Sequence, residues 1–182
     1  MKNLIIMLVI LTGQNLYSQE FVFKLYFQDS KGNSDTITLG YDMTATNSID
    51  SSQDEHNIYN KPLDSVFDVR ISNLWNKIEY GNNVDSFQTK RQIVKNNCDG
   101  WFPPVTIDMF CKNWPVTIKW DSSIFKDDCN IGSILTSFHP GGWFDAGSGF
   151  ITELSVTSSM TIQKFIDQNY STYDSTTQYF YL

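Results

Sequence analysis

The chain has 182 residues, with 13 Lys and Arg against 20 Asp and Glu, and its formal net charge is −7. An acidic chain without a cluster of basic residues is a poor ligand for nucleic acid, because phosphate contacts dominate that affinity. The length suits one domain with a sizeable buried core.

The first residues have the layout of a secretory signal peptide. Lys2 supplies a positive charge, an apolar run covers 4–11, and small and polar residues lead to Ser18. The run is far shorter than the roughly 20 residues that cross a bilayer, so we expect no membrane span. We predict cleavage of residues 1–18 and export of 19–182 as one domain, secreted or at the cell surface, with the periplasm as the alternative.

Short segments typical of β-strands follow. Polar and apolar residues alternate over 21–29, and a turn cluster separates this segment from 35–41, which predicts a β-hairpin. We predict further strands at 65–72, 86–94, 105–111, 116–120, 133–138 and 177–182, and a second hairpin from 150–157 and 161–166. No long window shows a sustained helical period. The pattern predicts an all-β fold, an antiparallel β-sandwich of the immunoglobulin-like or jelly-roll kind.

Two polar regions raise the question of a cation site. The first hairpin tip carries Asp29, Asn33 and Asp35, whose oxygen atoms are ligands that calcium prefers. Their spacing does not match a D-x-D-x-D-G loop, and Asp and Asn are also ordinary turn residues. The segment 42–64 is a long polar loop, and such loops in compact domains are usually functional or disordered. Calcium is the one cofactor hypothesis.

The chain has three cysteines, Cys98, Cys111 and Cys129. Export favours a disulfide, but three is an odd number, so at least one thiol stays unpaired or pairs outside the chain. A Cys98–Cys111 bond would close a short loop, which is worth about 3 kcal/mol in the chain-entropy model. Pairing of Cys129 with either of the other two stays open.

Aromatic residues concentrate between 101 and 144. Trp101, Trp143 and Phe144 fall in predicted loops, and Asp99 and Asp145 lie beside them. Indole rings stack on the apolar C–H faces of sugars while carboxylates bond the hydroxyls, so these five residues are a candidate glycan site. Core packing is the competing interpretation, because a large aromatic side chain gains roughly 1.5–3 kcal/mol on burial.

The stretch FHPGGWFDAGSGF, 138–150, illustrates the two interpretations. Pro140 ends the preceding strand, and Gly141 and Gly142 permit positive φ angles that other residues resist. We expect a wide structural loop here, with a glycan contact as the alternative. Trp120 ends an alternating strand and is expected in the core, whereas Trp114 is expected to pack over the connection that it precedes.

Three stretches together resemble a group of exported proteins. They are LYFQDSKGNSDTITLGYDMTATNSID (25–50), NWPVTIKWDSSIF (113–125) and PGGWFDAG (140–147). Their order is similar to that in secreted proteins of unknown function from Bacteroidota, which often carry a C-terminal type IX secretion sorting domain. We expect no such domain after the last predicted strand. The resemblance implies export and supplies no catalytic residue.

The function expected from the sequence is a secreted, non-catalytic binding or surface-interaction module. Its expected partner is a glycan or a cell-surface protein. One alternative is a structural adhesin or matrix protein that acts through an exposed sheet edge. The other is a secreted hydrolase with either a Cys129–His139 pair or two close carboxylates. No nucleophile elbow, zinc-protease motif or phosphate loop occurs, so no residue is assigned to catalysis.

Overall fold

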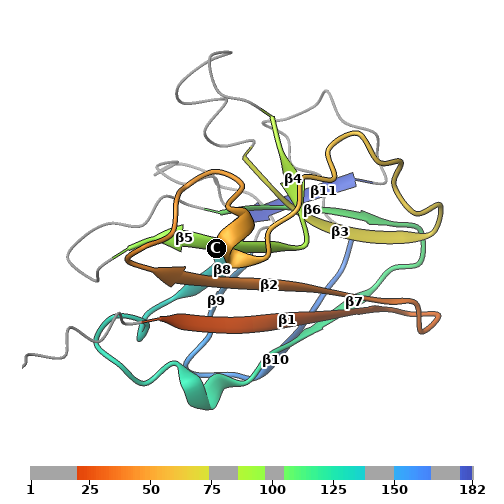
Figure 1. Cartoon of the computed structure of the whole chain (residues 1–182). Helices are drawn as coiled ribbons and strands as arrows, with labels where there is room; N and C mark the ends of the chain where they lie inside the picture. Colours follow the sequence, from red (N-terminus) through yellow and green to blue (C-terminus); the bar gives the residue numbers. More distant parts are fainter. Residues whose placement is uncertain (1–19, 74–85, 97–104, 138–149, 165–176, 182) are drawn as a thin grey trace, which may run out of the picture.

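A computed structural model describes residues 20–73, 86–96, 105–137, 150–164 and 177–181. These ranges contain eleven strands and two short 3-10 helices but no α-helix (Figure 1). The strands are β1 (Phe21–Asp29), β2 (Ser34–Asp42), β3 (Phe67–Ser72), β4 (Gln88–Thr89), β5 (Arg91–Lys95), β6 (Thr106–Cys111), β7 (Val116–Lys119), β8 (Ile134–Thr136), β9 (Ile151–Glu153), β10 (Ser159–Ile162) and β11 (Thr177–Tyr181), and the 3-10 helices are η1 (Ser51–Gln53) and η3 (Ser122–Ile124). The predicted all-β fold is confirmed. In the described ranges, no helix has the length and apolar character needed to cross a membrane.

The strands form two sheets. The five-stranded sheet has the order β10-β7-β1-β2-β5, and the six-stranded sheet has the order β4-β3-β6-β11-β8-β9. The predicted β1–β2 hairpin is confirmed, with Phe21 opposite Tyr41 and Gln28 opposite Ser34. Within the described ranges the strand pairs are antiparallel, as predicted, except β2 and β5, which run parallel.

One hydrophobic core lies between the two sheets. Side chains alternate between the two faces of β1, so Phe23, Leu25 and Phe27 point inward. Strands β3 and β6 contribute buried residues from the opposite sheet. Trp120 is 5% exposed, which confirms its expected place in the core, and its Nε1 donates to the carbonyl oxygen of Leu154 at 2.9 Å. The two sheets therefore form a sandwich around shared apolar contacts.

Two predicted segments change sheets instead of continuing in one. The expected strand 86–94 is divided at Lys90 into β4 of the six-stranded sheet and β5 of the five-stranded sheet. The chain therefore enters β5 from the other sheet. It then runs in the same direction as β2, so the two strands pair in parallel. The expected hairpin of 150–157 and 161–166 is wrong, because β9 belongs to one sheet and β10 to the other. Leu154 is buried between them, where the chain crosses the core edge.

Candidate functional site

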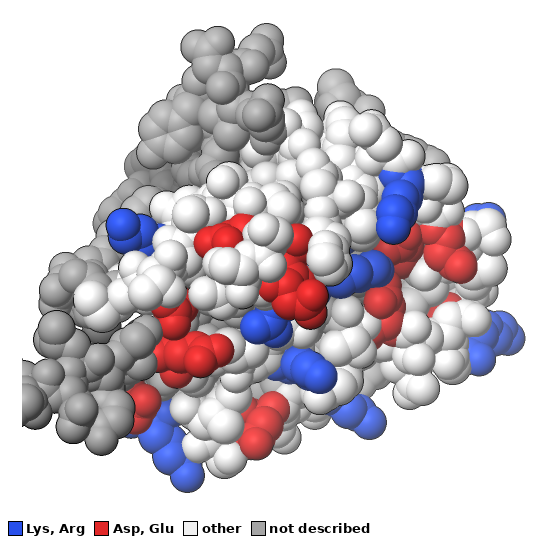
Figure 2. Space-filling view, viewed as in Figure 1, with Lys and Arg blue, Asp and Glu red and all other residues white. Residues whose placement is uncertain are grey.

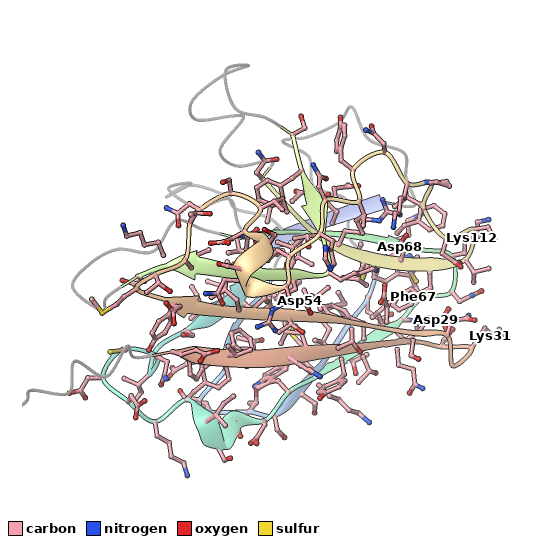
Figure 3. The ribbon with its side chains drawn as sticks, viewed as in Figure 1. Asp29, Lys31, Asp54, Phe67, Asp68 and Lys112 are labelled. Atoms are coloured by element: carbon pink, nitrogen blue, oxygen red, sulfur yellow. The ribbon has the colours of Figure 1, made fainter. Side chains whose placement is uncertain are left out.

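The outer side of β3 is as buried as its core side, since all six of its residues are buried. The odd-numbered residues face the core, so Asp68, Arg70 and Ser72 point to the opposite side of the six-stranded sheet. That side is covered by the long segment 43–66, which connects β2 to β3. Figure 3 labels Asp68 at this position on β3. The long polar loop therefore has charged residues beneath it.

Arg70 holds this loop through its backbone. Arg70 is 3% exposed, and its Nη1 donates to the carbonyl oxygens of Ile58 at 3.2 Å and Lys61 at 2.8 Å. Its Nη2 donates to the carbonyl oxygen of Pro62 at 2.7 Å. The Lys61 amide donates to the Ile58 carbonyl at 2.9 Å and closes a turn. We call residues 57–64 the clamped loop, because one buried side chain binds its backbone at three positions.

Lys90 joins the two sheets at the point where the chain changes from one to the other. Its Nζ contacts the carboxylate of Asp35 on β2, the carboxylate of Asp68 at 2.7 Å and the carbonyl oxygen of Val69 at 2.6 Å. Burial would raise the pKa of Asp68, but hydrogen bonds from Arg70 and Lys90 outweigh it and hold this pKa below its usual value. Asp68 therefore stays ionised between two cations.

Asp108 on β6 has the opposite electrostatic environment. Its two carboxyl oxygens accept hydrogen bonds from Ser72 Oγ at 2.9 Å and Gln88 Nε2 at 3.0 Å, which are neutral donors. Burial raises the pKa of Asp108 to about 7, against the lowering effects of these hydrogen bonds and of the Arg70 charge. Gln88 Oε1 accepts from Arg70 Nη1 at 3.0 Å. A continuous chain of hydrogen bonds thus links Asp108 to the clamped loop.

A second part of the long segment covers the outer edge of β5. Glu55 is 1% exposed, and its carboxylate accepts from the backbone amides of Ile93 at 2.6 Å and Asp50 at 2.9 Å. Asn47 Oδ1 accepts from the Lys95 amide at 3.0 Å. Burial raises the pKa of Glu55 despite these hydrogen bonds. The edge amides of β5 are therefore occupied by side chains of its own chain, which blocks pairing with another strand.

The predicted calcium ligands lie at the hairpin tip but are already hydrogen-bonded. Asp29 Oδ1 accepts from the amides of Lys31 and Asn33, both at 2.9 Å, and its Oδ2 accepts from Nδ2 of Asn33 at 2.7 Å and of Asn113 at 2.9 Å. Burial would raise the pKa of Asp29, but these hydrogen bonds lower it below its usual value. Asp35 instead pairs with Lys90. The described ranges contain no group of three or more His, Cys, Asp or Glu placed to hold a metal ion, so this geometry gives calcium no support.

The predicted glycan residues lie outside the described residues. They are Asp99, Trp101, Trp143, Phe144 and Asp145, and His139 of the hydrolase alternative is also outside. These assignments stay predictions. Trp114 is half-buried and packs against the core, as expected for a residue covering its connection.

Cys111 corrects the disulfide expectation. It is a free, buried thiol, so the Cys98–Cys111 and Cys111–Cys129 pairings are wrong. Of the three alternatives, only Cys98–Cys129 stays a prediction, and Cys98 lies outside the described residues. Burial raises the pKa of the Cys111 thiol, which keeps it protonated and weakly reactive.

Comparison with known proteins adds no assignment to this geometry. No family model, no curated protein and no solved structure matches the chain. The polar cluster of Asp68, Arg70, Lys90 and Asp108 was not singled out from the sequence. Its only signal there is a strand, FDVRIS, whose polar positions alternate with apolar ones, and such positions normally face water.

Proposed function

We propose that the chain is a secreted, non-catalytic binding module that contacts its partner through the clamped loop. The observation that carries this proposal is the attachment of that loop by Arg70, which fixes the backbone and leaves the side chains outward. A loop fixed before its ligand arrives loses less conformational entropy on binding. Binding residues are commonly found on loops that a rigid scaffold positions.

The acidic groups of the cluster have structural partners rather than room for a substrate. The carboxylates of Asp35 and Asp68 share Lys90 between them. A glycosidase needs its carboxyl pair free to face a sugar bond from both sides. The clamped loop covers Arg70 and Asp68. We therefore favour binding over hydrolysis at this face of the sheet.

A glycan is the first ligand class to test at the clamped loop. Tyr59 is 50% exposed and Leu63 is 43% exposed, and Asn60 and Lys61 lie between them on the surface. Figure 2 shows acidic and basic side chains mixed on the side of the molecule that carries the long loop. A surface of mixed charge, with an aromatic ring and an amide, suits a neutral sugar, whose C–H face stacks on the ring.

The experiment is a glycan array probed with labelled residues 19–182, followed by calorimetry on any neutral oligosaccharide that binds. We expect Tyr59→Ala to lower the affinity at least tenfold. His56→Ala serves as the control, since its side chain is 76% exposed in the same segment but lies outside the turn. An array without neutral hits, or equal losses in both variants, would count against the clamped loop as the contact surface.

The structural-adhesin alternative has one observation in its favour. Ile131, Ile134, Ile151 and Val156 are exposed around β8 and β9, with 63% exposure at Ile151 and 72% at Val156. β9 is an outer strand of the six-stranded sheet as described. An apolar edge of this kind favours pairing between copies of a chain. Light scattering at high protein concentration tests it, and a strictly monomeric result argues against it.

A further inference from the structure

The outward side of the five-stranded sheet carries a second surface, which we call the Tyr26 face. Strand alternation places polar and small residues here on β10, β7, β1 and β2. The face consists of Val22, Lys24, Tyr26, Gln28, Ser34, Thr36, Thr38, Gly40, Thr117, Lys119, Ser159 and Thr161. Tyr26 is 50% exposed near its centre, although neighbouring apolar residues of β1 point into the core.

The strand register defines the neighbours of Tyr26. Thr36 of β2 stands opposite on one side and Lys119 of β7 on the other. Directly opposed residues have Cβ atoms about 4.5–5.5 Å apart, so Thr36 and Lys119 are the nearest cross-strand neighbours of Tyr26. Lys24 lies two residues along the same strand, which is about 6.6 Å away. The aromatic residue thus has two lysines beside it on the same face of the sheet.

Hydroxyl groups continue this surface toward β10. Thr161 stands opposite Thr117, and their Oγ1 atoms are 3.2 Å apart. Hydroxyls arranged on a rigid sheet donate to and accept from sugar hydroxyls without reordering. The Tyr26 face therefore offers a stacking surface, cations and hydroxyl groups together.

The charge of this face is opposite to that of the chain. Its twelve residues include two lysines and no acid, whereas the whole chain has a net charge of −7. Glu20, which directly precedes β1, is an exposed acid at its border. Two further acids near its borders are engaged in hydrogen bonds. Asp42, at the far end of β2, is 7% exposed and accepts from the Thr44 amide. Asp121, beyond β7, accepts from the Ser123 amide at 2.9 Å.

We propose that the Tyr26 face binds an acidic glycan, with a hexuronate ring stacked on Tyr26 and its carboxylate paired with Lys24 or Lys119. Charges further than about 10 Å from this face are largely screened at 0.1 M salt, so the more distant acids of the chain oppose this ligand only weakly. The inference rests on the proposed binding role and adds to it a second surface and a ligand class. A solvated polar sheet face is the ordinary alternative, and it predicts no binding.

The test is electrophoresis of residues 19–182 in native gels cast with polygalacturonate, with alginate, with neutral β-glucan or without polymer. The variants are Tyr26→Ala, the double variant Lys24→Gln/Lys119→Gln, Tyr59→Ala and His56→Ala. Tyr59→Ala reports on the clamped loop. His56→Ala is the control, because the His56 side chain is 76% exposed and belongs to neither surface. Each mobility is divided by that of the same variant in the polymer-free gel, which removes the effect of the changed charge.

We expect polygalacturonate or alginate to retard the wild type. Tyr26→Ala and the double lysine variant should each weaken the apparent affinity at least tenfold, and 0.5 M salt should do the same. His56→Ala should bind these polymers as the wild type does. Circular dichroism and thermal unfolding of each variant show that its fold is intact.

The inference is overturned if neither acidic polymer retards the wild type, or if His56→Ala loses as much affinity as Tyr26→Ala. Retardation by β-glucan that depends on Tyr59 alone would overturn it while supporting the clamped loop as the contact surface. Absence of binding to every polymer would count against both proposals.

Discussion

The long segment 43–66 and the pair of strands β8 and β9, which we call the β8–β9 corner, differ in what lies at their outward positions. The segment lies over buried polar side chains. Arg70 donates hydrogen bonds to its backbone, and Glu55, a residue of the segment, accepts from the edge amide of Ile93 on β5. The β8–β9 corner has Ile134 and Ile151 on its outward side, and both are exposed. The comparison teaches that, in this fold, a charged side chain beneath a loop determines where that loop lies. Where the outward positions are apolar, no described segment covers them.

Substitution of Arg70 should have the largest effect on stability and should release the long segment. We expect Arg70→Met to lower the free energy of unfolding by about 3–5 kcal/mol, because it leaves the buried Asp68 carboxylate without one of its two cations. Three loop carbonyls also lose their donor. Urea denaturation measures the loss, and hydrogen exchange should increase over residues 57–64. Lys24→Met is the control, since an exposed substitution usually changes stability by less than about 0.5 kcal/mol.

Asp108 makes the clamped region sensitive to pH. Its pKa is raised from 3.8 to about 7, so the folded state keeps the proton that the unfolded chain has already released. The free energy of unfolding should therefore fall as pH rises from about 4 to about 7, by roughly 1.4 kcal/mol for each pH step of one between these two values. Above that range the contribution of Asp108 stays level, because both states are then ionised.

Asp108→Asn should remove most of this slope, as measured by urea denaturation between pH 5 and pH 8. Asn accepts from Gln88 Nε2 and donates to Ser72 Oγ, so the variant keeps both contacts. Glu55 contributes a residual slope of the same sign, because its pKa is also raised. A wild-type stability that rises over this pH range would contradict the assignment.

The cysteines provide a further test of the structure. We predict a Cys98–Cys129 disulfide, the one pairing that leaves Cys111 free. Peptide mapping without reduction should find this bond, and Cys111 should react with iodoacetamide only after denaturation. Cys129→Ser should cost about 3–4 kcal/mol in the chain-entropy model for a loop of this length. Recovery of Cys111 in a disulfide would refute the prediction.

Glu55 tests the covered edge of β5. Glu55→Gln keeps one acceptor for the Ile93 amide but turns a donor toward the Asp50 amide, so we expect a loss of about 1–3 kcal/mol. Asp54→Asn is the matched control, because its side chain is 86% exposed next to Glu55 in the sequence. Thermal unfolding of the pair should show a lowered midpoint for the first variant alone.

The smallest effect on stability is expected at the corner. Ile151→Lys should change the free energy of unfolding by less than about 0.5 kcal/mol, since the residue is 63% exposed. If the corner mediates self-association, the same change should shift the protein to monomer in light scattering. A wild type that is already monomeric at high concentration would remove the support for an adhesin.

The sequence predicts the strands well where each has one apolar and one polar side. β1 spans the predicted residues, and Trp120 lies in the core as expected. The sequence pattern does not predict features that depend on contacts between residues far apart in the chain. The segment 86–94 has the pattern of one strand, and only the approach of Lys90 to Asp35 and Asp68 shows why it bends from one sheet into the other. The polar side of β3 has the pattern of a solvent-facing side, because no local signal shows that residues 57–64 return to cover Arg70.

The division of residues 88–95 between the sheets has a mechanical consequence. A force that pulls the five-stranded sheet away from its partner acts on β5, and this load passes at once through Lys90 to β4 and β3. Neither layer can peel off while that connection holds. The two sheets should therefore separate under tension only when this connection breaks.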